Sequence, residues 1–173
     1  MNDMEVHAVR LRGNLHVTRL EQTWQDVLRR HETLCPLVRV DKKTFCKLEV
    51  VEVRGSPAAT QCAKYEEAVR RELQRSSGLL LRGVLVRLSP GDHVLVVNQH
   101  HIASDGLSLR VFWRDLEALY RGEKLAGSGS VQYRDFALWQ REVAGSERFA
   151  QSVAFWKAKL GMDPEPLNMP TQH

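Results

Sequence analysis

The spacing of apolar residues along this chain predicts an alternation of strands and helices. In some segments apolar and polar residues alternate, which is typical of half-buried strands, and in others apolar residues recur every three or four positions, which is typical of amphipathic helices. Strands are expected at residues 5–12, 45–53, 81–88 and 93–99. Helices are expected between Thr18 and Pro36, over 58–73, after Gly106, and over 133–144 and 147–160. The chain is therefore expected to be an α+β protein.

Two of these helices have apolar faces that predict burial. In the first helix the residues of this face are Leu20, Trp24, Val27, Leu28 and His31. Thr18 and Glu21 match a capping box at the start of the same helix. In the last helix the corresponding residues are Phe149, Val153, Trp156 and Leu160. We expect both faces to pack in the core, because a stripe of large apolar residues at helical spacing is typical of a buried helix face.

A polar run follows the second strand of a predicted hairpin. The turn Ser89–Asp92 joins strands 81–88 and 93–99, and the second strand leads into Asn98-Gln99-His100-His101-Ile102-Ala103-Ser104-Asp105-Gly106. Histidine is the side chain that exchanges protons near neutral pH. These residues alone leave two interpretations open: a catalytic group exposed at the end of a strand, or a structural histidine beside an Asp-Gly turn.

His101 is the better catalytic candidate of the two histidines, because an acid and the start of a helix follow it closely. Asp105 can cap that helix, and Gly106 leaves room for a substrate. The unpaired N–H groups of the helix N-terminus can stabilise an oxyanion. These groups suit acyl transfer. A covalent mechanism through Ser104 or Ser108 is disfavoured, because the chain has no G-x-S-x-G turn.

Composition and charge argue against several other classes of protein. The 173 residues are 43% hydrophobic and 27% charged with a net charge of +4, which is ordinary for a soluble domain. The cations are scattered, so nucleic-acid binding is disfavoured. Cys35, Cys46 and Cys62 form no CxxC pair, which suits a reducing compartment, and they lie at no metal-ligand spacing with the histidines, so no metal is expected. No apolar run reaches the roughly 18 residues of a membrane span, so no membrane partner is expected.

Residues 100–108 resemble the HHxxxDG motif of condensation domains from nonribosomal peptide synthetases, which belong to the chloramphenicol acetyltransferase-like superfamily. Further segments resemble other motifs of this family, in the same order along the chain. These segments are Leu11–Leu15, Arg30–Leu34 (RHExLR), Gln132–Gln140 (QYxDYAxWQ), Phe155–Leu160 (YWxxxL) and Leu167–Pro170 (LxLP). The resemblance covers essentially the whole chain.

The resemblance implies a chloramphenicol acetyltransferase-like lobe, with a mixed or antiparallel sheet flanked by helices. A condensation domain has two such lobes. Residues 1–160 resemble the N-terminal lobe without its initial segment, and residues 161–173 resemble the crossover linker or a tail. In the family, the active site lies in a tunnel between the lobes, where two carrier proteins present a donor thioester and an aminoacyl acceptor on phosphopantetheine arms. The implied reaction is amide bond formation, with no cofactor bound directly. The implied partners are the donor and acceptor carrier proteins and the second lobe.

The resemblance also implies roles for single residues. His101 would take a proton from the acceptor amine or position that amine, Asp105 would be structural, and Gly106 would face the substrate. Three residues would support the site: His100, packed away from the tunnel, Arg30 and Ser108.

One departure from the family affects the expected bracing of Asp105. The family usually has a second arginine after RHExL, where this chain has Cys35 followed by Pro36. An arginine of that motif normally braces the motif aspartate by an ion pair, and Arg30 is the arginine that remains. The sequence is therefore also compatible with a divergent domain, or with a specialised one in a polyketide–peptide hybrid.

Two other functions are compatible with the same residues. The chain could be a non-catalytic lobe that binds a carrier protein, or a stand-alone acyltransferase that uses coenzyme A. In each case we expect a cytoplasmic protein.

Overall fold

The computed structural model describes residues 4–34, 47–52, 80–125 and 131–161, together with Thr60, Ala63, Glu66 and Gly127. Cys35, Cys46, Cys62, most of the predicted helix over 58–73 and nearly all of the predicted tail lie outside the described residues. The chain divides into two compact units, residues 1–130 and 131–173. The expectation that residues 1–160 form one lobe stays a prediction.

The first unit is built on a mixed sheet in the order β1-β4-β3-β2. The strands are β1 (Met4–Arg12), β2 (Glu49–Glu52), β3 (Leu81–Ser89) and β4 (Asp92–His100). Strand β4 pairs antiparallel with both β1 and β3, and the short β2 pairs parallel with β3. The predicted hairpin is confirmed, as is the prediction that the histidine pair stands at the end of its second strand.

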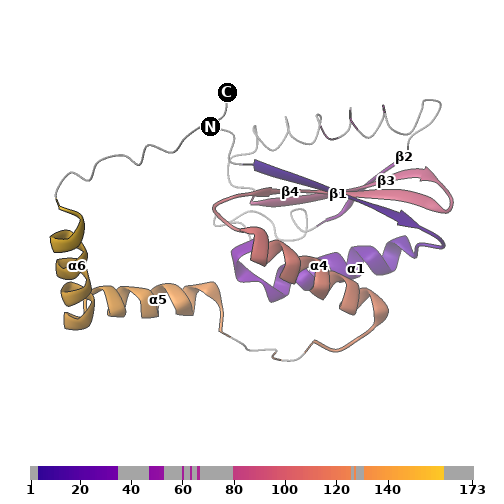
Figure 1. The fold of residues 1–173 in the computed structure, drawn as a ribbon. Coiled ribbons are helices and arrows are strands. Elements are labelled where there is room, and N and C mark those ends of the chain that lie inside the picture. The colour runs from indigo at the N-terminus through magenta and orange to yellow at the C-terminus, as the bar shows by residue number, and fades with distance from the viewer. Residues whose placement is uncertain are drawn as a thin grey trace, which may run out of the picture. The chain divides into compact units, whose positions relative to one another are not determined.

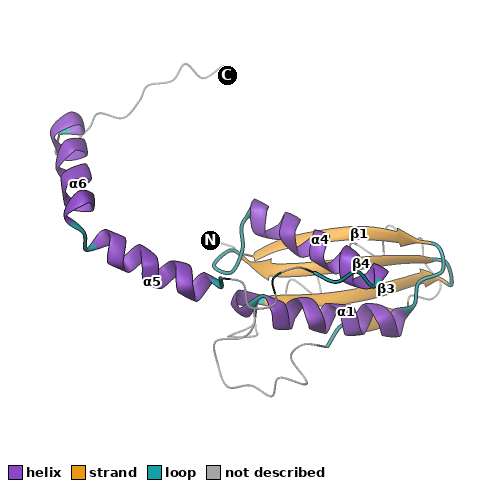
Figure 2. Cartoon of the chain, turned by 90° about the horizontal axis from the view of Figure 1, so that it is seen from below, coloured by secondary structure: helices purple, strands orange, loops and turns teal. Residues whose placement is uncertain are grey.

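Two helices, α1 (Val17–Arg30) and α4 (Gly106–Arg121), cover one face of this sheet (Figures 1 and 2). Four residues of the predicted face of α1 are buried, namely Leu20, Trp24, Val27 and Leu28, but His31 follows the helix as its C-cap and is partly exposed. Trp24 packs edge-to-face against Phe112 of α4 with ring centroids 5.6 Å apart. Gly83 of β3 makes this packing possible, because a Cβ atom there would lie 2.5 Å from the Trp24 ring. Apolar side chains therefore hold the two helices against the strands that carry the site.

The predicted capping box at the start of α1 is wrong. The helix begins at Val17, its N-cap is His16, and no side chain caps it. The backbone N–H of His16 instead donates to the Tyr120 hydroxyl, 3.0 Å away at the end of α4. A tertiary contact between the two helices thus takes the place of the local cap that the sequence predicts.

The second unit contains α5 (Tyr133–Ala144) and α6 (Glu147–Leu160), which have the predicted boundaries. The predicted burial of the α6 face is wrong: Phe149, Trp156 and Leu160 are 44–57% exposed, and neither helix has a buried residue. Two helices alone cannot enclose an apolar face on all sides. None of the described helices in either unit is long and apolar enough to cross a membrane.

Candidate functional site

Residues 100–108, which we call the motif loop, begin with the last residue of β4 and extend into the first turn of α4. The backbone N–H of His100 still donates to the Leu80 carbonyl at 2.8 Å, as a residue of the sheet does. A tight turn follows, in which the N–H of Ala103 donates to the His100 carbonyl at 2.9 Å. Helix α4 starts at Gly106, so five residues separate a strand end from a helix N-terminus.

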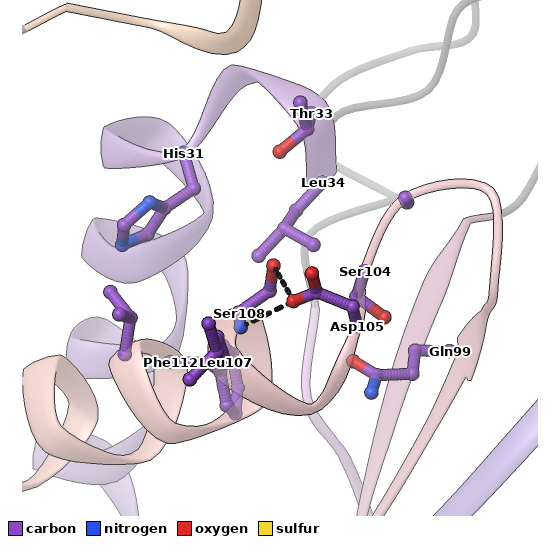
Figure 3. Close-up of a pocket in the computed structure, with 11 residues that line it drawn as sticks. His31, Thr33, Leu34, Gln99, Ser104, Asp105, Leu107, Ser108 and Phe112 are labelled. Carbon is purple, nitrogen blue, oxygen red and sulfur yellow. Dashed lines mark hydrogen bonds between the residues drawn. The ribbon is translucent and has the colours of Figure 1, made fainter. Parts of the chain in front are cut away.

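Asp105 closes the motif loop as the N-cap of α4. Its backbone is extended, and its carboxylate accepts from the Ser108 N–H at 2.8 Å and from the Ser108 hydroxyl at 2.7 Å (Figure 3). These bonds, the one from the hydroxyl foremost, lower the pKa of Asp105 below its ordinary value. Asp105 is therefore ionised at neutral pH. Because the Ser108 N–H is already bonded, this donor of the helix N-terminus is not available to an oxyanion.

The motif loop leaves open space beside Gly106. A Cβ atom at this position would meet no other atom within 4 Å, and the residue does not have a positive φ. Neither packing nor backbone conformation within the described residues therefore requires a glycine here. The absence of a side chain at Gly106 leaves this space open.

The imidazole of His101 lies between two hydrogen-bond acceptors. Its Nε2 is 2.9 Å from a carboxylate oxygen of Glu5, and its Nδ1 is 3.3 Å from the backbone carbonyl of Ser104. The ring is 56% exposed, so a substrate can reach it. Glu5 comes from β1, and no pattern in the sequence points to it, because its contact with His101 depends on how β1 pairs with β4.

His100 faces the other way. Neighbouring residues of a strand point to opposite sides of the sheet, and the helix-covered side of β4 carries Leu95, Val97 and Gln99. The Nδ1 of His100 accepts from the backbone N–H of Ile102 at 3.1 Å, which ties it to the turn. This placement agrees with a supporting rather than a catalytic role.

A pocket of about 310 Å³ lies beside the motif loop, where it meets the end of α1 and the short 3-10 helix η1 (Glu32–Leu34) (Figure 3). The lining residues come from three separate segments: His31, Thr33 and Leu34; Gln99; and Ala103, Ser104, Asp105, Leu107, Ser108, Val111 and Phe112. The two segments that resemble RHExLR and HHxxxDG are thus brought together in space.

Asp115 of α4 is a buried acid that contacts the start of the Arg30–Leu34 segment. Its carboxylate contacts Arg30 at 3.3 Å, His31 at 3.0 Å and Arg114 at 2.8 Å. Burial opposes ionisation, but the hydrogen bonds from Arg114 and His31 outweigh it and leave the pKa of Asp115 lowered. The ion pair between Arg30 and Asp115 joins the end of α1 to α4. Asp115 lies on the apolar stripe of α4, between Phe112 and Leu119, and that position was the signal that could have revealed it.

Within the described residues, no group of three or more His, Cys, Asp or Glu side chains is arranged to hold a metal ion.

The class of protein follows from comparison with known families. The family model for the condensation domain matches residues 4–173, and the chain belongs to this family. The mixed sheet flanked by helices is the fold that its structural relatives share, so the predicted fold class is confirmed.

The relatives are large synthetases. The chain is 33% identical over 186 residues to the isonitrile lipopeptide synthase of Mycobacterium tuberculosis, and 34% identical over 184 residues to the hybrid PKS-NRPS synthetase thnA of Trichoderma harzianum. These matches cover 95% and 98% of this chain but only 7% and 4% of the two relatives.

The chain also matches part of the length of two solved proteins. The SgcC5 protein of Streptomyces globisporus is 32% identical with a TM-score of 0.66, and the match covers 92% of this chain and 40% of that one. The X-domain from teicoplanin biosynthesis is 29% identical with a TM-score of 0.76, with 96% and 40% covered. The chain thus corresponds to less than half of each solved protein.

Proposed function

We propose that this chain is the His101-bearing lobe of a condensation domain that joins a carrier-bound acyl or peptidyl thioester to a carrier-bound aminoacyl group. The observation that carries the proposal is the motif loop itself. It presents a solvent-accessible histidine just after strand β4 and an open glycine at the start of α4, and other residues of the same loop line a pocket. Family membership supplies the reaction class, which is acyl transfer.

The chemistry that we propose is an attack of the acceptor amine on the thioester carbonyl of the donor. A C–N bond forms and the C–S bond breaks, so an amide and a free thiol result. The nitrogen loses one proton, and the departing thiolate gains one. An imidazole near the reacting amine can take the first proton and deliver the second, which typically accelerates such a step about 10²- to 10⁴-fold.

The other residues of the motif loop serve that histidine in our proposal. Asp105 fixes the start of α4 through Ser108, so the turn that carries His101 has a fixed end. Gly106 lets the substrate approach the backbone closely. His100, Arg30 and Ser108 support this arrangement through the contacts described above.

The partners that we propose are two carrier proteins and a second lobe. The chain covers 40% of the SgcC5 protein and of the teicoplanin X-domain, which leaves room in such proteins for a second lobe. The substrates would arrive on phosphopantetheine arms, and no cofactor would bind to the lobe directly. A protein of this kind works in the cytoplasm.

The test is reconstitution with the protein extended to both lobes. One carrier protein is loaded with an acyl group and the other with an amino acid, and the amide product is measured by mass spectrometry. We expect amide on the acceptor carrier only when both carriers are loaded. Binding of a carrier without any product would instead indicate a non-catalytic lobe, and product from acyl-coenzyme A without a donor carrier would indicate a stand-alone acyltransferase.

A further inference from the structure

We propose that Glu5 is a positioning residue for His101, and that strand β1 therefore contributes a side chain to the reaction. This inference rests on the function proposed above and extends it to a residue outside the motif loop. The carboxylate of Glu5 lies 2.9 Å from Nε2 of His101. Its other oxygen lies 3.5 Å from Nε2 of His7, so Glu5 bridges two imidazoles.

The register of the sheet places Glu5 where it can do this. Glu5 is the cross-strand partner of Gln99 near the end of β4, and His101 is the first residue after that strand. The pairing of β1 with β4 therefore brings the Glu5 side chain within reach of the turn that carries His101. The side-chain amide of Gln99 approaches His7 at 3.4 Å, so residues of both strands surround the carboxylate.

The contact holds the ring of His101 and places a negative charge beside it. Both ring nitrogens face acceptors, and the Glu5 carboxylate is the nearer and stronger of the two. When the imidazole takes the proton of the acceptor amine, the ring becomes an imidazolium and the adjacent carboxylate balances its charge. The proton then passes from the imidazolium to the thiolate, and Glu5 is unchanged.

A purely structural role for this pair predicts a different outcome. Both partners are partly exposed, with side-chain exposures of 56% for His101 and 35% for Glu5. Ion pairs with this exposure contribute little to folding stability. A variant that loses only the Glu5 carboxylate is therefore expected to fold, and a large loss of rate in that variant has to come from the chemistry of His101.

The kinetic test compares Glu5→Gln, Glu5→Asp and His101→Ala in the protein extended to both lobes, with loaded carriers as substrates. We expect Glu5→Gln to lower kcat about 10- to 100-fold, the effect of a misplaced catalytic group, with KM for both carriers unchanged. Glu5→Asp keeps the charge and should recover part of the loss. The matched control is Asp92→Asn, which removes a carboxylate paired with Arg10 at the opposite end of the same two strands and should leave kcat unchanged.

The spectroscopic test records the ¹⁵N shifts of the histidine rings in the same variants. Glu5→Gln should change the ¹⁵N shifts of the two ring nitrogens of His101, because a neutral amide replaces the carboxylate beside Nε2, and Asp92→Asn should not. Native kcat and native ring shifts in Glu5→Gln, with His101→Ala inactive, would overturn the role of Glu5 and leave the proposed function standing. Full activity in His101→Ala would overturn the proposed function, and the inference with it.

Discussion

Asp105 caps helix α4 and Asp115 lies within it, yet their carboxylates have opposite surroundings. Asp105 is exposed at the N-cap, and Ser108, three residues away, provides its hydrogen bonds. Asp115 is 1% exposed and binds Arg30 and His31, which are far away in the sequence. The acid of the motif is thus held locally, while an acid outside every motif joins α4 to α1.

This difference shows which contacts hold each part of the candidate site in place. The motif loop can be ordered by its own helix cap, but its position relative to the Arg30–Leu34 segment depends on Asp115. Removal of each carboxylate should therefore have a distinct result. Loss of Asp115 should mainly affect folding, and loss of Asp105 should mainly affect the reaction.

The largest effect should come from Asp115→Ala. The change leaves Arg30 and His31 without a shared acid in a partly buried place, and breaking buried ion pairs costs about 3–5 kcal/mol. Because the three cations keep some access to water, we expect about 3 kcal/mol. Urea denaturation measures this loss. Glu117→Ala on the same helix removes an exposed pair with Arg121 and serves as the control, with an expected loss of no more than about 0.5 kcal/mol.

The stability difference between native protein and Asp115→Asn should depend on pH. The pKa of Asp115 is lower in the folded protein than its ordinary value of 3.8. Its ionised form therefore stabilises the fold fully above that value, and the contribution disappears as the pH falls through the lowered pKa. Urea midpoints between about pH 6 and pH 2 should converge for the two proteins at the acid end. A constant difference would show that the charge of Asp115 contributes nothing to stability.

Two substitutions of Asp105 should distinguish its role as helix cap from a direct role of its charge in the reaction. Asp105→Ala removes the cap and should destabilise the fold less than Asp115→Ala, because the carboxylate is exposed, while the rate of amide formation falls. Asn is as good an N-cap as Asp, so Asp105→Asn should keep most of the activity. Equal inactivity of both variants in a product assay would assign the charge of Asp105 a direct part in the reaction.

The smallest effect on folding should come from Gly106→Ala. A methyl group there meets no neighbour, and such a change can stabilise a protein by about 0.4–1 kcal/mol, since the unfolded chain loses freedom. The same methyl group should lower the rate if a substrate occupies the open space. A thermal melt and a product assay on one sample measure both effects, and unchanged activity would place the substrate elsewhere.

The sequence predicted the local features of the fold well, because they depend on residues near one another. The face of α1 around Trp24 and the hairpin that ends at His100 both follow from apolar spacing. Apolar spacing predicted burial of the α6 face wrongly, because periodicity identifies an apolar face but not the surface that would cover it.

The sequence revealed only part of the candidate site, for the same reason. The motif loop with His101, Asp105 and Gly106 is contiguous, so a pattern could reveal it. The Glu5–His101 contact depends on the register between β1 and β4, and the Arg30–Asp115 contact depends on how two helices pack. Neither the strand register nor the helix packing can be predicted from the spacing of nearby residues.

The most direct test of the central claim is the single-turnover rate of amide formation by His101→Ala, in the protein extended to both lobes and with both carriers loaded. His16→Ala is the control, because His16 is exposed and lies at the start of α1. If His101 is the acid–base group of the reaction, the rate falls about 10²- to 10⁴-fold in His101→Ala, while carrier binding and the His16→Ala rate stay native. A native rate in His101→Ala would contradict the assignment of this strand end as the reacting centre.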